Sequence, residues 1–278
     1  MAILMAVMSS VVWGTSDFIG GLVSRRMPAY VVVATSQAAG LAAVTVAALV
    51  TGDFGDQRGW VAPAIGAGVS LTAGLVMFYT ALATGTMGIV SPIAALGVLV
   101  PVGVGLLRGD APSAVTSVGV AVALGGVVLA TGPELRRGTG GKPVVLAASA
   151  AVCFGIAMVL LAQGARTNPL MSLWGMRVTS VAGLTVAILL VARSRTRAAI
   201  RSWDVPLVVL AGLGDASANL LFSLASLRDY LSVVSVLASL YPAMTVLLAR
   251  VVLQQRLLPA QIAGVGAALC GVVLISLG

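Results

Sequence analysis

Histidine is absent from this sequence, and few of its residues carry a charge. Asp, Glu, Lys and Arg together make up 9% of the 278 residues, against about 25% in a typical soluble domain. Without imidazole, Ser-His-Asp catalysis, histidine metal sites and the usual proton shuttle near neutral pH are excluded. With 59% hydrophobic residues, the chain has too little polar surface for a water-soluble fold. Lipid is therefore the expected solvent.

Cysteine and aromatic residues are also scarce. Cys153 and Cys270 each lie inside an apolar run, so we expect buried free thiols rather than a disulfide or a metal pair. Aromatic residues make up 5% and are not interleaved with the basic ones, so the net charge of +8 predicts no nucleic-acid partner. No glycine-rich loop ends in Gly-Lys-Ser/Thr. We therefore expect no cofactor, no metal ion and no ATP-driven step.

Charges and turn residues divide the chain into long apolar segments. A helix that crosses the hydrocarbon needs about 20 mostly apolar residues. Ten segments of this length follow from the sequence: residues 2–23, 29–51, 61–83, 87–107, 113–132, 143–165, 169–192, 205–227, 231–252 and 259–277. The sequence thus predicts an all-α integral membrane protein with ten transmembrane helices.

The two halves of the chain share similar sequence segments. Residues 119–129 (GVAVALGGVVL) and 264–274 (GVGAALCGVVL) are identical at eight of eleven positions. The segments that begin at Ser91 and Ser232 also align, with Pro101 opposite Pro242. We predict a first five-helix repeat over 1–132, a cytoplasmic linker over 133–142 and a second five-helix repeat over 143–278. Because five is odd, the second repeat must enter the membrane from the opposite side. Inverted repeats of this kind are typical of transporters, with the binding site where the halves meet.

Basic residues predict how the chain is oriented. Loops after odd-numbered segments carry eleven Lys and Arg, whereas loops after even-numbered segments carry four. We expect the protein in the cell membrane. The positive-inside rule then places the loops after odd-numbered segments in the cytoplasm and both termini on the opposite side of the membrane.

Three ionisable residues lie inside predicted spans: Asp17, Arg177 and Asp215. Each costs about 2.5–3.5 kcal/mol on membrane-insertion scales, so retained ones are functional candidates. Asp215 lies near the middle of its span, with Asn219 one turn later on the same face, and is the first candidate for substrate binding or proton coupling. For Asn219 the alternative is a plain interhelical contact. Asp17 is a candidate for proton exchange or for attracting a cation, the alternative being a place near the cytoplasmic interface, either solvated or paired with Arg25 or Arg26.

Arg177 has three open interpretations. Its planar guanidinium suits a substrate carboxylate or phosphate. It could instead form an internal ion pair with Asp215, because the two predicted depths differ by about one helical turn. It could also extend to the membrane interface.

Aromatic and proline residues complete the candidate set. Trp13, Tyr79 and Tyr241 lie within spans and could line a pocket, the alternative for each being core or lipid packing. Pro92, Pro101 and Pro242 free backbone carbonyls, so each could act as a hinge, expose an acceptor or simply kink its helix.

Two short features carry a family resemblance. These are the Trp13-Gly14 pair and the Gly-Val-Val-Leu that closes each half, at 126–129 and 271–274. With prolines near the middle of the fourth and ninth spans, the chain resembles the drug/metabolite transporter superfamily in its ten-span EamA branch. Where that family commonly has a Gly-Glu pair after spans four and nine, this chain has Gly109-Asp110 and Gln254-Gln255.

The resemblance implies a secondary carrier with a central cavity between the halves. Related four-span drug exporters use a carboxylate of their first span for proton exchange, and Asp17 is a loose analogue. We expect a proton- or gradient-coupled exporter of a small metabolite or drug-like solute that works by alternating access. The alternatives are a sugar or small-solute uptake carrier or exchanger of the same fold, a non-transporting scaffold and, least supported, a membrane-embedded enzyme. The expected partners are a small-molecule substrate, protons and membrane lipid, and the internal duplication makes a single chain sufficient.

Overall fold

The computed structural model describes residues 1–52, 58–107, 113–136, 141–192, 204–228, 234, 237–238, 240–255 and 257–277. Within these ranges every regular element is a helix, so the predicted all-α fold is confirmed. The elements are α1 (Ala2–Val23), α2 (Ala29–Thr51), α3 (Val61–Thr84), α4 (Met87–Ala95), the 3₁₀ turn η1 (Leu96–Val98), α5 (Leu99–Leu107), α6 (Ala114–Arg136), α7 (Gly141–Ala165), α8 (Pro169–Ala192), α9 (Val205–Ser226), α11 (Tyr241–Val252) and α12 (Pro259–Leu277).

Several helices are long and apolar enough to cross a bilayer. Six meet both criteria among the described residues: Ala2–Val23, Ala29–Thr51, Val61–Thr84, Gly141–Ala165, Pro169–Leu189 and Val205–Ser226. Shorter apolar helices cover Met87–Pro101, Tyr241–Val252 and Pro259–Gly271. The chain is therefore a multi-pass membrane protein, while the count of ten crossings stays a prediction.

Helix α6 differs from its predicted segment at its C-terminal end. The sequence placed a boundary at Gly132, before Pro133, because both residues break helices. In the structure α6 continues through them to Arg136. The first half thus ends on a longer helix than predicted.

The fourth predicted span, 87–107, is not one regular helix. It divides into α4, η1 and α5, and Pro92 lies inside α4. Pro101 has no N–H to donate to the carbonyl of Gly97, four residues earlier, so the α-helical ladder is interrupted there. The 3₁₀ turn η1 occupies that position.

Pro242 starts a helix rather than kinking the middle of one. It lies in the first turn of α11, which begins at Tyr241. A proline is well placed there because the first N–H groups of a helix have no intrahelical partner. The expected kink within span 231–252 is therefore corrected to a helix start.

Some predicted features lie outside the described residues. They include Gly109-Asp110, linker residues 137–140, the basic residues from 193 to 201, residues 231–233 and Arg256.

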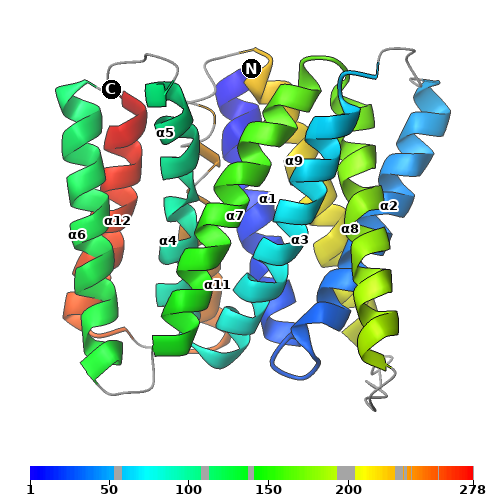
Figure 1. Cartoon of the computed structure of the whole chain (residues 1–278). Helices are drawn as coiled ribbons and strands as arrows, with labels where there is room; N and C mark the ends of the chain where they lie inside the picture. Colours follow the sequence, from blue (N-terminus) through cyan, green and yellow to red (C-terminus); the bar gives the residue numbers. More distant parts are fainter. Residues whose placement is uncertain are drawn as a thin grey trace.

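Figure 1 shows the helices running side by side, with both chain termini at the same end of the molecule. Helix α1 packs against α9, α3 packs against α7 and α8, and α2 packs against α8 and α9. Helices α6 and α12 pair with each other at one side of the bundle. First-half helices thus pack mainly on second-half helices.

Glycines bring α6 and α12 together in a reciprocal way. A Cβ on Gly126 would lie 2.7 Å from the carbonyl oxygen of Gly264 and would overlap the backbone of Ala268. A Cβ on Gly271 would lie 2.6 Å from the carbonyl oxygen of Gly119 and would overlap the backbone of Ala123. These small residues let the two backbones touch, as is common between helices in lipid.

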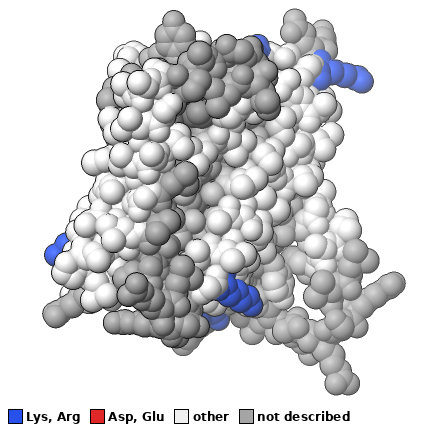
Figure 2. All heavy atoms as spheres, turned by 60° about the vertical axis from the view of Figure 1, so that its left-hand side comes forward, with Lys and Arg blue, Asp and Glu red and all other residues white. Residues whose placement is uncertain are grey.

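The outer surface is apolar, as a lipid-facing surface must be. Exposed aliphatic side chains include Leu49, Val69, Val145 and Leu189. In the view of Figure 2 the described side chains in the middle of the face are uncharged, and Lys and Arg lie towards its ends. Cys153 and Cys270 are free thiols, as expected, but Cys270 is exposed and Cys153 is half-buried, so the expected burial is corrected. An apolar run in lipid need not face the protein interior.

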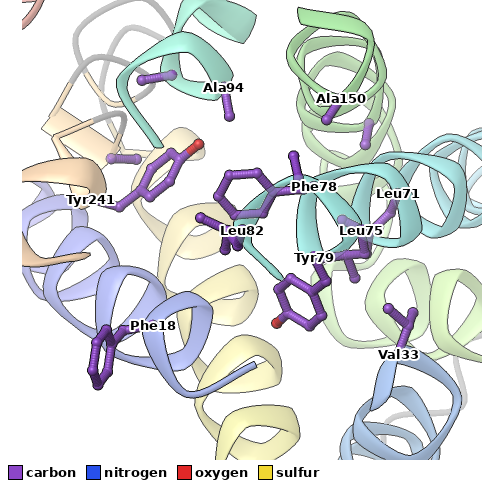
Figure 3. Close-up of a cluster of buried hydrophobic side chains, with 14 of the residues drawn as sticks. Phe18, Val33, Leu71, Leu75, Phe78, Tyr79, Leu82, Ala94, Ala150 and Tyr241 are labelled. Carbon is purple, nitrogen blue, oxygen red and sulfur yellow. The ribbon is translucent and has the colours of Figure 1, made fainter. Parts of the chain in front are cut away.

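Aromatic side chains tie three helices together inside the bundle. The ring of Phe78 on α3 lies edge-on to Phe154 of α7 and to Tyr241 of α11, with centroids 5.4 and 6.5 Å apart. Figure 3 shows Phe78 between α3 and Tyr241, with Tyr79 directed to another side of α3. Phe154 and Tyr241 of this cluster also line the central cavity described below.

Candidate functional site

A cavity lies within the bundle. Its cavity volume is about 60 Å³, so in this conformation it is smaller than a typical small-molecule site. Its lining residues come from α1, α3, α7, α8, α9 and α11 and are Trp13, Asp17, Leu71, Leu75, Phe154, Ala157, Met158, Leu161, Met176, Asp215, Asn219, Phe222 and Tyr241. Most of this wall is apolar, so its few polar groups decide which ligands it can hold.

Asp215 is held by several donors. Its Oδ2 accepts a hydrogen bond of 2.6 Å from Nη1 of Arg177, and its Oδ1 accepts bonds of 3.0 Å from Nε1 of Trp13 and from Nδ2 of Asn219. Gln37 contributes through Nε2, 3.4 Å from Oδ2. We call these five residues the polar network. Because every donor converges on one carboxylate, Asp215 is fully committed within the protein.

Small residues allow the helices of the polar network to approach closely. A Cβ on Gly212 of α9 would overlap the backbone of Ser36 on α2, and one on Gly214 would overlap the side chain of Ser16 on α1. Ser9 on α1 donates a hydrogen bond of 2.8 Å to the carbonyl of Ala218 on α9. These contacts place Asp215 within reach of donors from α1 and α2.

Asp17 lines the same cavity but has a different environment. It lies one turn after Trp13 on α1, and 7% of its surface is exposed. Among the described residues the ion pairs are Arg177–Asp215 and Arg26–Asp204. The structure therefore excludes an ion pair of Asp17 with Arg25 or Arg26. Asp17 is thus a buried carboxylate facing the cavity.

Arg177 forms the internal ion pair that the sequence left open. Its side chain is fully buried on α8, which excludes the extension to the membrane interface. Nη1 also donates to Oε1 of Gln37 over 2.6 Å, while Nε and Nη2 have no partner within the described part of the chain. Arg177 lies behind Asp215 and is not among the residues that line the cavity.

The aromatic candidates take different places. Trp13 and Tyr241 line the cavity, and the hydroxyl of Tyr241 is buried with no hydrogen-bond partner among the described residues. Tyr79 is not among the lining residues, and its ring fills the space beside Gly20 of α1. For Tyr79 the structure therefore favours the core-packing alternative.

Sequence reasoning missed Gln37. It is fully buried on α2 and contacts both members of the ion pair. The signal available was an amide near the middle of a predicted span, which must find a partner in lipid.

No group of three or more His, Cys, Asp or Glu side chains that could hold a metal occurs among the described residues.

Comparison with known proteins gives two findings. Residues 141–277 match the EamA-like transporter family. A solved structure, described as "Crystal structure of protein", superposes with a TM-score of 0.73 at 19% identity and covers 99% of this chain and 96% of that chain. At this identity the likeness concerns the fold alone. None of the curated proteins compared with the chain matches it.

The helical fold and its apolar outer surface define a multi-pass membrane protein with a mostly apolar central cavity. The family match over residues 141–277 makes the second half of the chain similar to the EamA-like transporters. The predicted resemblance to the drug/metabolite transporter superfamily is thereby confirmed. The family points to transport rather than catalysis.

Proposed function

We propose that this protein is a secondary active transporter that exports a small metabolite or drug-like solute by alternating access, driven by a proton or another gradient. The observation that carries the proposal is the charge balance of the cavity. Among the described residues that line it or contact its lining carboxylates, two are acidic, Asp17 and Asp215, and one is basic, Arg177. One carboxylate is therefore left without a protein cation.

Asp17 is the carboxylate that exchanges its partner in this proposal. Asp215 already accepts hydrogen bonds from Arg177, Trp13 and Asn219, so releasing it would leave a buried arginine unpaired. Asp17 has no such commitment among the described residues. Since an isolated charge in lipid is costly, Asp17 must be neutralised by a proton or by a cationic group of the solute. Alternation between the two would couple transport to a gradient.

The apolar wall determines the rest of the solute. Leu71, Leu75, Met158, Leu161 and Phe222 face the same space as the carboxylates. Such a wall favours an organic body over a small inorganic ion. A sugar would need several hydrogen-bonding partners, which this wall does not offer, so the cavity gives less support to the sugar-carrier alternative. The polar network, with its buried charges, likewise gives little support to a scaffold.

Two inverted repeats provide the moving parts of the proposed carrier. The reciprocal contacts of Gly126 with Gly264 and of Gly271 with Gly119 join sequence-equivalent positions of α6 and α12. Reciprocity of this kind is expected of two copies related by a two-fold axis. We assign the repeats to 1–132 and 143–278, joined by a linker at 133–142, and helices of both repeats line the cavity. A single chain is sufficient for this arrangement.

Orientation is part of the proposal. Both termini lie at one end of the molecule (Figure 1), and the C-terminal ends of α1 and α11, which Arg25, Arg26 and Arg250 adjoin, lie at the other. For a protein of the cell membrane, the positive-inside rule then places the termini outside the cytoplasm and the basic end on the cytoplasmic side.

A two-step assay tests the proposal. Purified protein is screened for thermal stabilisation by amino acids, sugars, nucleosides and organic cations, because a bound ligand raises the unfolding temperature. Any stabilising compound is then assayed for movement across proteoliposomes with and without an imposed pH gradient. We expect gradient-dependent movement. Exchange that ignores the gradient would favour the uncoupled alternative, and the absence of any movement of a bound compound would refute transport.

A further inference from the structure

A second, larger hollow lies away from the central cavity. It contains about 1170 Å³ of atom-free space, including its open side, and we call it the α11–α12 crevice. Its lining residues are Gly88 of α4, Val246, Ala249 and Arg250 of α11, Gln254, Gln255 and Leu257 of the connection, and Ile262 and Val265 of α12. None of them lines the central cavity.

The crevice has one charged end and an apolar remainder. Val246, Ala249, Leu257, Ile262 and Val265 provide aliphatic surface along α11 and α12. The charge comes from Arg250, in the last turn of α11. Among the described residues Arg250 forms no ion pair, and no acidic residue lines the crevice. Its positive charge is therefore available to an anion.

The turn after α11 holds amide groups beside this charge. Gln254 has a φ of 53°, which is uncommon for a residue other than glycine, and its Nε2 donates to the carbonyl of Val251 over 2.8 Å. The following residue, Gln255, is held by a backbone bond of 3.3 Å to the carbonyl of Ala249. Its Oε1 is buried and has no hydrogen-bond partner among the residues that the structure describes. A buried acceptor without a donor is unfavourable, so a bound donor there would be stabilising.

The crevice lies at the depth expected for a lipid headgroup. It lies where α11 ends and α4 and α12 begin, at the end of the molecule opposite the two termini (Figure 1). Phospholipid phosphates lie at this level, and basic pockets between membrane helices bind anionic headgroups. The aliphatic residues continue from Arg250 along α11 and α12, as an acyl chain would.

We propose that the α11–α12 crevice binds one anionic phospholipid from the surrounding bilayer. Its phosphate pairs with Arg250, a headgroup hydroxyl donates to Oε1 of Gln255, and one acyl chain lies against Val246, Ile262 and Val265. A zwitterionic lipid binds this site more weakly, because its own positively charged ammonium group competes with Arg250 for the phosphate. The inference does not depend on the proposed transport function.

Thermal unfolding of the purified full-length protein with added lipid tests the site. Phosphatidylglycerol should raise the unfolding temperature more than phosphatidylcholine with the same acyl chains, and native mass spectrometry should retain one phosphatidylglycerol. The variant R250Q should weaken this binding about fivefold, as expected for one basic residue at a membrane surface. The variant V246W, which fills the crevice without changing charge, should weaken it as well.

R25Q is the matched control, because Arg25 is exposed at the same end but outside the crevice. It should bind phosphatidylglycerol as the wild type does. Equal stabilisation by the two lipids would overturn the proposal, as would equal losses in R25Q and R250Q, which indicate diffuse attraction. Full stabilisation by inorganic phosphate alone would also overturn a lipid site.

Discussion

At the scale of single residues, the two carboxylates of the cavity are not equivalent. Asp215 is the hub of the polar network, whereas Asp17 faces the same cavity without a protein cation. We therefore propose different roles for two chemically similar residues: Asp215 holds α1, α2, α8 and α9 in place, and Asp17 changes its partner during transport. Substitutions separate these roles.

Asp17→Asn should stop gradient-driven transport while leaving the protein at least as stable as the wild type. The substitution removes an unpaired charge from lipid, so the fold loses no partner. Transport should fall to the rate of liposomes without protein, and Asp17→Glu should retain part of the activity. Parallel measurements of flux and unfolding temperature check this. Wild-type transport by Asp17→Asn would remove Asp17 from the mechanism.

Asp215→Asn and Arg177→Met should each destabilise the protein by about 3–5 kcal/mol, because each leaves the other member of a buried pair uncompensated. The double variant should lose clearly less than the sum of the two single losses. Chemical unfolding in detergent measures all three. Strictly additive losses would show that the 2.6 Å pair contributes no coupling.

Rarity made the charged part of the site predictable. Asp17, Arg177 and Asp215 could be selected because ionisable residues inside an apolar span are expensive. The Arg177–Asp215 pair could only be offered as one of several interpretations, since depth alone does not fix the rotation of a helix. Gln37 was missed because a neutral amide carries a weaker signal than a charge. Tyr79 and Tyr241 could not be separated without the packing of α1, α3 and α11.

At the scale of the helices, glycine decides which pairs touch. Gly126→Ala and Gly271→Ala should each destabilise the protein by about 1–3 kcal/mol, since the added methyl group meets the backbone of the facing helix. The two losses should be similar, because the contacts are reciprocal. Thermal unfolding gives the comparison.

Matched controls lie on the same helices. Gly125 on α6 and Gly266 on α12 have open space where a Cβ would stand. Gly125→Ala and Gly266→Ala should therefore be neutral or slightly stabilising, because alanine is the better helix former. If these controls destabilise as much as the Gly126 and Gly271 variants, close α6–α12 packing is not the cause.

Most helix positions followed from the sequence, because turn residues and charges interrupt apolar runs. Helices α1 and α2 have the predicted bounds of 2–23 and 29–51. A hinge or kink at Pro101 was among the predicted interpretations, but the 3₁₀ turn η1 was not, since a proline shows where a hydrogen bond is lost but not how the chain accommodates it. The start of α11 at Tyr241 reflects the same limit. Both irregular regions lie in the predicted counterpart spans four and nine.

At the scale of the whole molecule, the proposed duplication explains why the cavity lies between the halves. Helices α1 and α3 come from the first proposed repeat, and α7, α8, α9 and α11 come from the second. Rocking of one half against the other would open the cavity to each side of the membrane in turn. Alternating access is therefore the central claim.

Thiol accessibility at Met158, a lining residue of the cavity, tests this claim most directly. Met158→Cys is introduced after Cys153 and Cys270 are changed to serine, and a membrane-impermeant thiol reagent is applied from each side of oriented vesicles. We predict labelling from both sides, with a transported solute shifting the ratio of the two rates and protecting the thiol. Labelling from one side only, at a rate that no solute or gradient changes, would contradict a carrier.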